Sequence, residues 1–276
     1  ATAERAPQVL EGLGVAPGIA VGPAYLLEAG AIRVAIHTLA DDEVADEVAR
    51  FNAAVAKGQR QLRKLKSKSA NLPGAAAEEM GYLLEAYLQM LSGSRLLRGV
   101  ERRISQEKIN AEAAVQAEIA EIAEGFAALS DQYLAARADD IREVGDRLIR
   151  NLTQTPFAAF SELTPGTVVI AEELSPADTA LLDPALVSGF ATVLGGPEGH
   201  TAIMARSLAL PAVLGVAGLL GAVHNGDTVV VDGSSGHVVI NPSAEMLAEY
   251  EHRQSEYRNE QRMLAVGYPT RAYKLL

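Results

Sequence analysis

The sequence has 276 residues, 49% of them hydrophobic and 21% charged, which excludes a chain that is disordered throughout. Its 24 basic and 35 acidic residues give a net charge of −11, which argues against nucleic acid and anionic membrane surfaces as partners. Because cysteine is absent, disulfides and thiolate chemistry are excluded, and we expect a cytoplasmic protein. The longest uncharged stretches, 12–27 and 207–226, are interrupted by proline and glycine, so no membrane-spanning helix is predicted.

The composition of residues 38–152 predicts an all-helical block. They contain no proline except Pro73 and are rich in Ala, Glu, Arg, Leu and Gln, a composition that favours helices. Apolar residues recur at helical spacing, as Val44, Val48, Phe51 and Val55 do. Breaks near Pro73, residues 92–94 and Ser130 divide the block into four predicted helices, which we expect to pack as a bundle.

Residues 153–242 change to short Val- and Ile-rich runs bounded by Gly, Pro and Asp, a pattern typical of strands. We predict strands at 167–171, 191–194 and 228–232, helices at 175–182 and 201–208, and a hairpin that joins 228–231 to 237–240. Residues 1–37 use Gly, Pro and Val in the same way, so we assign them to the same discontinuous α/β domain, with the helical block inserted. Residues 243–276 are predicted to form a linker helix, over 243–265, toward a domain outside this sequence.

The most informative segment is 195–207, in which a glycine-rich turn places His200 at the start of a predicted helix. There the imidazole lies beside backbone N–H groups and the positive end of the helix dipole, where an anion such as a phosphoryl group is favoured. Neutral imidazole is a nitrogen nucleophile near pH 7, so the position suits a transient phosphohistidine. The alternative is that His200 is only a polar loop residue and the glycines only make a turn.

Other motifs carry less chemistry. Gly12-x-Gly14 lacks the helix that a dinucleotide loop requires, and the four remaining histidines are scattered, so we predict no metal site. Charges over 101–108 and 137–150 are interpreted as solvated helix faces before binding surfaces. The acidic pair Glu78-Glu79 precedes an apolar stripe that includes Tyr82 and Tyr87; this combination suits a partner surface, with core packing of the stripe as the alternative.

Three motifs resemble a known family. They are the opening segment 12–22, with Ala16-Pro17-Gly18-Ile19-Ala20; the helical segment 133–151; and the segment 195–212, Gly-Gly-x-x-x-His-Thr-x-Ile-Met-Ala-Arg-Ser-Leu-x-Leu-Pro-Ala. On these motifs, which run through nearly all of the chain, the sequence resembles the N-terminal half of Enzyme I, the phosphoenolpyruvate-protein phosphotransferase of the bacterial phosphotransferase system. The implied fold is an α/β phosphohistidine (swivelling) domain, discontinuous, with an inserted all-α bundle.

The resemblance implies that His200 accepts a phosphoryl group on Nε2 and passes it to a histidine of the small carrier HPr. Thr179 matches the family threonine that hydrogen-bonds the active histidine, and Arg206 matches the signature arginine. Because Arg206 lies about 240° around an ideal helix from His200, no direct phosphate contact is predicted for it. Thr201 is expected to offer the phosphate a first-turn N–H and a hydroxyl.

In the family, the helical insert is the HPr-docking platform. An acidic and apolar surface steers a carrier that has a basic rim, while its apolar centre supplies affinity. The resemblance maps this platform onto Glu78, Glu79, Tyr82, Tyr87, Met90, Leu96, Phe126 and Arg137.

The sequence departs from the family pattern at several positions. Gly199 replaces a hydroxyl residue before the histidine, and Ser94 and Arg95 stand where members of the sugar branch have acids, so a nitrogen-branch carrier stays open. The family's barrel domain, which binds phosphoenolpyruvate and Mg²⁺ and drives dimerisation, would follow the linker helix. We therefore expect this chain to have no cofactor of its own, to be monomeric, and not to use phosphoenolpyruvate alone, whereas the full-length protein would be a homodimer.

Two alternatives to phosphoryl transfer from His200 to HPr remain open from the sequence. One is the phosphohistidine domain of an enzyme of the pyruvate phosphate dikinase or phosphoenolpyruvate synthase kind, which shares the Gly-Gly to His turn but lacks the helical insert. The other is a non-catalytic docking module, in which the bundle binds a partner and His200 is only structural.

Overall fold

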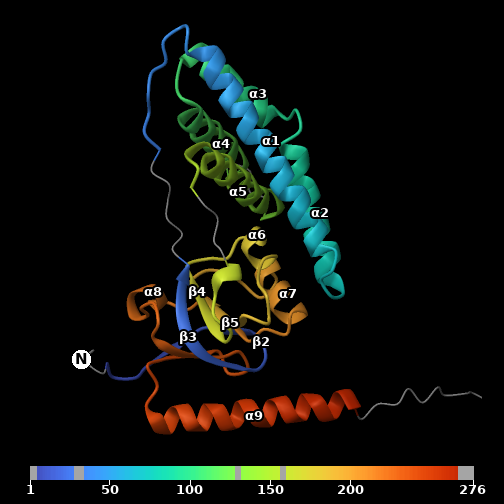
Figure 1. The fold of residues 1–276 in the computed structure, drawn as a ribbon, viewed down its shortest axis with the longest axis vertical. Coiled ribbons are helices and arrows are strands. Elements are labelled where there is room, and N and C mark those ends of the chain that lie inside the picture. Colours follow the sequence, from blue (N-terminus) through green and yellow to red (C-terminus); the bar gives the residue numbers. More distant parts are fainter. Residues whose placement is uncertain (1–4, 28–33, 128–131, 156–159, 267–276) are drawn as a thin grey trace, which may run out of the picture. The chain divides into compact units, whose positions relative to one another are not determined.

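A computed structural model describes residues 5–27, 34–127, 132–155 and 160–266 (Figure 1). The chain divides into two compact units. The first comprises 1–29, 159–174 and 181–276, and the second comprises 30–158 and 175–180. The chain therefore leaves the first unit and returns to it, and the predicted α/β fold with a helical insertion is confirmed.

The first unit is built on one eight-stranded sheet of order β1-β8-β7-β3-β4-β5-β6-β2. The central strand β3 pairs in parallel with β4 and antiparallel with β7, whereas the other two N-terminal strands, β1 and β2, stand at the two ends of the sheet order. The strands are β1 (Gln8–Glu11), β2 (Leu13–Ala16), β3 (Ile19–Leu27), β4 (Thr167–Ala171), β5 (Val187–Thr192), β6 (Ala212–Leu214), β7 (Thr228–Asp232) and β8 (His237–Ile240).

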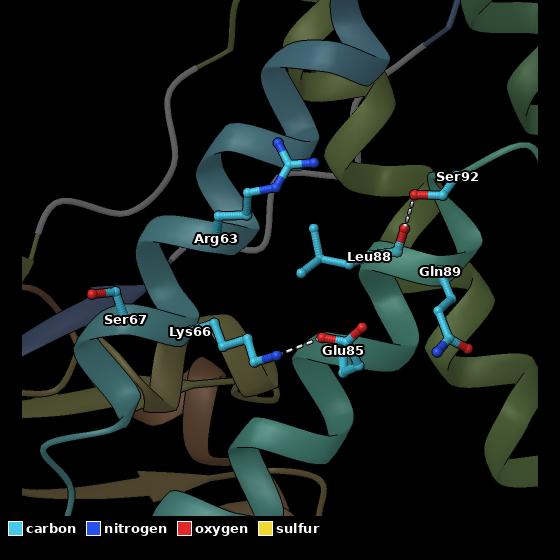
Figure 2. A pocket seen from close by; sticks show the side chains of 7 residues that line it. All are labelled: Arg63, Lys66, Ser67, Glu85, Leu88, Gln89 and Ser92. Atoms are coloured by element: carbon cyan, nitrogen blue, oxygen red, sulfur yellow. Dashed lines mark hydrogen bonds and ion pairs between the residues drawn. The ribbon is translucent and has the colours of Figure 1, made fainter.

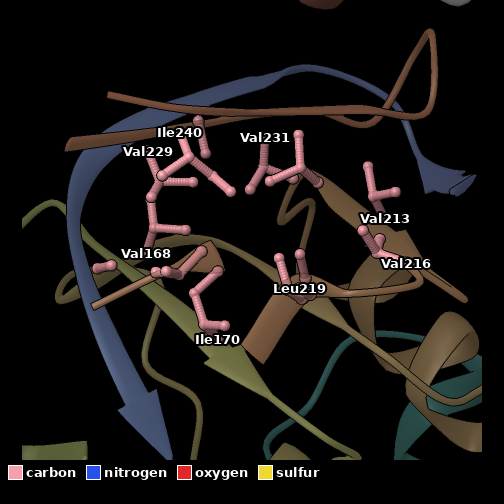
Figure 3. Packing of buried hydrophobic residues seen from close by; sticks show 13 residues of the cluster. Val168, Ile170, Val213, Val216, Leu219, Val229, Val231 and Ile240 are labelled. Carbon is pink, nitrogen blue, oxygen red and sulfur yellow. The ribbon is translucent and has the colours of Figure 1, made fainter. Parts of the chain in front are cut away.

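The predicted strands 167–171 and 228–232 are found at those residues, and the hairpin of β7 and β8 is confirmed. All five residues of β4 are buried, as a Val- and Ile-rich strand covered on both faces should be. Figure 3 shows how the side chains of one cluster converge from several strands and from α8 (Leu219–Ala222). This cluster contains Val168, Ile170, Val213, Val216, Leu219, Val229, Val231 and Ile240.

A second, smaller cluster involves the long helix α9 (Ala244–Val266). Met246 and Tyr250 of α9 pack against Ile19, Val230 and Val239 of the sheet. The Gln254 side-chain amide also donates a hydrogen bond to the Ile19 carbonyl, at 2.7 Å. The helix that was predicted over 243–265 is thus held on the α/β unit by an apolar face and by a hydrogen bond from a side chain to the backbone.

The stretch 30–158 of the second unit contains five α-helices among the described residues, where four were predicted. They are α1 (Val44–Ser69), α2 (Ala75–Met90), α3 (Arg95–Arg102), α4 (Ala111–Ala127) and α5 (Gln132–Thr153), with a π-helical turn, η1 (Arg103–Glu107), after α3. The additional break follows from Lys108, which has a left-handed φ of 52°, and from Asn110. The Asn110 side chain accepts a hydrogen bond from His37 N and donates one to Ala35 O, at 2.8 and 3.1 Å, which fastens the preceding extended segment here.

The three remaining short elements are α6 (Pro176–Thr179), α7 (His200–Ser207) and a 3-10 turn, η2 (Phe160–Glu162). The expected domain ranges were 1–37, 38–152, 153–242 and 243–276. The structure differs most at residues 175–180, which group with the helical unit, where the Ser175 side chain is a hydrogen-bond partner of Glu143 on α5. Within the described part of the chain, no helix combines the length and the apolar character needed to cross a membrane.

Candidate active site

The turn that carries His200 runs from the end of β5 to the start of α7. Thr192, the last residue of β5, donates its hydroxyl to Leu194 O at 2.5 Å. Gly195 then adopts a φ of 115°, a conformation that residues with a Cβ rarely take. Gly199 is the N-cap of α7, so His200 is the first residue of the helix, one residue before the predicted start at 201.

His200 is half-buried at this helix end. Its Nε2 lies 3.4 Å from Leu174 O, and the buried Thr201 donates its hydroxyl to the same carbonyl at 3.3 Å. The carbonyl of Gly199 accepts hydrogen bonds from both Ala202 N and Ile203 N, which closes the first turn of α7. An imidazole at this positive helix end is placed where a phosphoryl group would be stabilised.

Arg206 is on the same helix and is directed to the backbone around the turn. Its Nη1 donates to Pro197 O at 3.3 Å, within the glycine-rich turn, and to Val15 O at 3.4 Å, in β2. The guanidinium therefore ties the turn to the sheet. This structural role was not predicted for the signature arginine, because no sequence pattern reveals contacts with carbonyls this distant in the chain.

Thr179 is fully buried in α6, and its hydroxyl donates to Pro176 O at 2.9 Å. It belongs to residues 175–180 of the helical unit, whereas His200 belongs to the α/β unit. The hydrogen bond between Thr179 and His200 therefore stays a prediction.

The predicted docking residues differ in how far they are exposed. Glu78, Glu79 and Tyr82 are exposed on α2, and Tyr82 keeps 78% of its surface. Met90 and Phe126 are partly exposed. The side chain of Arg137 lies outside the described part of the structure.

Tyr87 and Leu96 require a correction, because they are 1% and 5% exposed and belong to the core of the helical unit. Tyr87 lies five positions after Tyr82, about 140° around an ideal helix, so the two side chains face different sides of α2. The Tyr87 hydroxyl donates to Asp140 Oδ1 at 3.2 Å, and burial raises the pKa of Tyr87 above its ordinary value. For Tyr87 the core-packing alternative therefore holds, and Leu96 likewise belongs to the core.

Helix α5 carries a close charge pair of Glu143 and Arg147, although the charges over 137–150 predict a solvated helix face. Arg147 is 3% exposed, and its Nη2 lies 3.9 Å from Glu143 Oε1. Burial raises the pKa of Glu143 to about 7, against the opposing effect of the Arg147 charge. Burial likewise lowers the pKa of Arg147. The helical spacing of four residues could have identified the pair, but nothing in the sequence reveals its burial.

A surface hollow of about 610 Å³ lies between α1 and α2 (Figure 2). Lys66 of α1 and Glu85 of α2 form an ion pair across it at 2.5 Å, and Arg63 and Leu88 also line it. None of the predicted site residues lines this hollow. Among the described residues, no group of three or more His, Asp or Glu side chains could hold a metal ion.

Two family models match the chain. The N-terminal domain model of the PEP-utilising enzymes covers residues 11–137, and the mobile-domain model of the same enzymes covers residues 163–236. The α/β unit with its histidine turn, together with the helical unit, thus defines the N-terminal part of a PEP-utilising enzyme.

Individual relatives show which kind of PEP-utilising enzyme this chain resembles. A phosphoenolpyruvate-protein phosphotransferase of Bacillus sp. (strain S) is 38% identical over 250 residues, covering 91% of this chain and 42% of the relative. A solution structure of an Enzyme I (nEIt) protein is 37% identical, with a TM-score of 0.77, over 90% of this chain and 99% of the other. An N-terminal domain of Enzyme 1 - Nitrogen is 29% identical, with a TM-score of 0.61, over 89% and 99%. The chain belongs to the Enzyme I family of phosphoenolpyruvate-protein phosphotransferases, and it spans less than half the length of such curated relatives.

Proposed function

We propose that this chain is the phosphoryl-relay part of an Enzyme I. In the full-length protein, His200 takes a phosphoryl group that originates from phosphoenolpyruvate and transfers it to a histidine of an HPr-type carrier. The observation that carries the proposal is the place of His200 as the first residue of α7, after a glycine-rich turn. Family membership supports the same function over the docking-module alternative.

The transfer exchanges one N–P bond for another. For phosphorylation on Nε2, the lone pair of this nitrogen attacks phosphorus while the bond to the donor breaks, and the proton of His200 stays on Nδ1. In the structure, Nε2 lies 3.4 Å from Leu174 O, a carbonyl that would repel the phosphoryl oxygens. The ring therefore has to turn away from Leu174 O before the transfer. Thr201, whose hydroxyl faces the same carbonyl, can then donate to the phosphate instead.

We further propose that α2 presents the docking surface for the carrier. Glu78, Glu79 and Tyr82 are exposed together on this helix, and Met90 and Phe126 are partly exposed. The two carboxylates would attract a carrier with a basic rim, and Tyr82 would supply a large amphipathic contact. Tyr87 and Leu96 would support this surface from the core beneath it.

The proposal assigns phosphoenolpyruvate and Mg²⁺ to a further domain of the full-length protein, which would also supply the homodimer contact. The absence of cysteine from the sequence supports a cytoplasmic location. This chain alone is expected to exchange phosphate with the carrier as a monomer.

The decisive experiment mixes this chain with a phosphorylated HPr-type carrier and measures the intact mass. We expect the parent chain to gain one acid-labile phosphoryl group, and His200→Ala to gain none. His252→Ala is the matched control, because His252 is exposed on α9 and should leave the gain unchanged. An equal gain in His200→Ala would refute the assignment, and tight carrier binding without any gain would favour the docking-module alternative.

A further inference from the structure

The segment 175–180 is a rigid turn that carries Thr179. Ser175 Oγ accepts a hydrogen bond from Asp178 N at 3.1 Å, while Asp178 Oδ2 accepts from Ser175 N at 3.1 Å and from Ser175 Oγ at 2.8 Å. This reciprocal capping box, with Pro176 at the first helical position, fixes α6 despite its length of four residues. Whatever holds Ser175 and Asp178 therefore also determines where Thr179 lies.

Helix α5 supplies that hold within the helical unit. The Glu143 carboxyl group and the Ser175 side chain are hydrogen-bond partners, and Asp178 acts electrostatically on both Glu143 and Arg147. Arg147 is the positive charge that interacts with both carboxylates; its Nη2 lies 3.9 Å from Glu143 Oε1, and its side chain is 3% exposed. The Arg147 guanidinium also donates to Gln61 of α1, at 3.4 Å, which ties this contact into the bundle.

We propose that Glu143 and Arg147 are positioning residues, which hold α6 on α5 and thereby set the place of Thr179 for the phosphoryl relay. The inference rests on the proposed function for the importance of Thr179. It does not require either residue to touch the phosphoryl group.

The charges around Glu143 make this hold depend on protonation. Asp146 on α5 and Asp178 on α6 oppose its negative charge, and Arg147 favours it. Near Arg147 lie the further groups Tyr87 of α2 and Arg150 of α5. With burial as the dominant effect, the pKa of Glu143 rises to about 7. Because the ionised carboxylate gains hydration when α6 leaves α5, a rise in pH above about 7 loosens the segment.

The test is an NMR titration of the full chain from pH 5.5 to 8.5, followed at the Thr179 amide. It is performed in a His200→Ala background, because histidine itself ordinarily titrates at about 6.5. We expect the chemical shift of the Thr179 amide to change with a single midpoint near pH 7 in the His200→Ala chain. In the double variant His200→Ala, Glu143→Gln this pH-dependent change should be lost. Glu124→Gln, an exposed site on α4, should retain it.

Three results would overturn the inference: a flat Thr179 shift with Glu143 present, a midpoint unchanged by Glu143→Gln, or a midpoint unchanged by Arg147→Leu. Arg147→Lys keeps the charge and should restore a midpoint close to that of the parent. Phosphorylation by the carrier is measured separately on the chain with His200. If that reaction fails while the titration behaves as expected, the proposed function is wrong and the contact between α5 and α6 stands.

Discussion

Arg253 of α9 reaches Asp232 at the end of β7, with 2.8 Å between Nη2 and Oδ2. Asp232 has no exposed surface, and its other oxygen accepts hydrogen bonds from Ser234 N and Ser235 N, both at 3.1 Å. One carboxylate therefore closes the turn between β7 and β8 and anchors the last helix. The Arg253 guanidinium also lies 5.1 Å from the centroid of the Tyr250 ring, which belongs to the apolar face of α9.

Replacing Arg253 with Met should destabilise the α/β unit by about 2 kcal/mol, because the buried Asp232 loses its counter-charge and keeps only the two backbone donors. Urea denaturation of both chains would measure the difference. Arg258→Met, at an exposed position of the same helix, is the control and should change little. Equal losses in the two variants would show that the ion pair contributes nothing.

The two tyrosines of α2 should behave in opposite ways. Tyr82→Ala removes an exposed side chain and should weaken carrier binding about tenfold, with little change in stability. Tyr87→Ala removes a core side chain and should cost about 3–5 kcal/mol of unfolding free energy. Calorimetric titration with the carrier and denaturation of each variant separate the two effects. Unchanged binding by Tyr82→Ala would place the docking surface elsewhere.

Arg206→Ala should slow phosphoryl transfer from the carrier about tenfold. The variant loses the two hydrogen bonds that tie the turn before His200 to β2, each of which contributes about 1 kcal/mol. Arg206→Lys, which keeps a cationic donor, should give an intermediate rate. Rapid-quench measurement of the phosphorylated chain provides the rates, with Arg258→Ala as the control. A parental rate in Arg206→Ala would rule out the proposed bracing.

Ala209→Gly should stabilise the chain by about 0.5–1 kcal/mol. Ala209 follows the end of α7 with a φ of 52°, a conformation that glycine adopts without strain. The gain is partly offset, because glycine also makes the unfolded chain more flexible. Ala248→Gly, inside α9, should instead destabilise the chain, because it replaces a good helix former. Thermal denaturation of both variants would test this, and destabilisation by Ala209→Gly would contradict the expectation.

The stability of the helical unit should depend on pH through Glu143. Its pKa is raised from 4.5 to about 7 in the folded chain, so the folded state binds this proton more tightly than the unfolded state. The unfolding free energy should therefore fall as pH rises from about 4.5 to 7, by about 3 kcal/mol, and stay level above that range.

Glu143→Gln imitates the protonated carboxyl group and should remove this dependence. It should match the parent at pH 5 and exceed its stability at pH 8, in denaturation curves followed by circular dichroism. Glu124→Gln should retain the parental slope. A parental slope in Glu143→Gln would assign the pH dependence to other groups, among them Asp146, whose pKa burial also raises.

The sequence predicted those parts of the fold that local patterns determine. The strand 167–171 is a Val- and Ile-rich run bounded by Gly166 and Glu172. The similar composition of 1–37 predicted that this segment would join the same domain, and β3 does join this sheet. His200 was identified because a glycine turn and a helix start are both local signals.

The same local patterns do not reveal which side chains are buried or which residues distant in the chain are in contact. Tyr82 and Tyr87 both follow the acidic pair on α2, and only the packing of the bundle shows that one is exposed and the other is in the core. The place of α6 depends on contacts with α5, more than 25 residues earlier in the chain, and so do the roles of Glu143 and Arg147. The hydrogen bond from Arg206 to Val15 O likewise depends on the fold and has no signal in the local sequence.

The pairing of the sheet also constrains the order in which the chain can assemble. Ala24 pairs with Val168, and Gln8 pairs with Ile240. The strands at the start of the chain therefore cannot pair until these later residues have been synthesised. Residues 30–158 form a continuous stretch of the helical unit and need only 175–180 to complete it. The helices can therefore fold during synthesis while β3 is still unpaired, and the high contact order of the sheet makes its closure the late step.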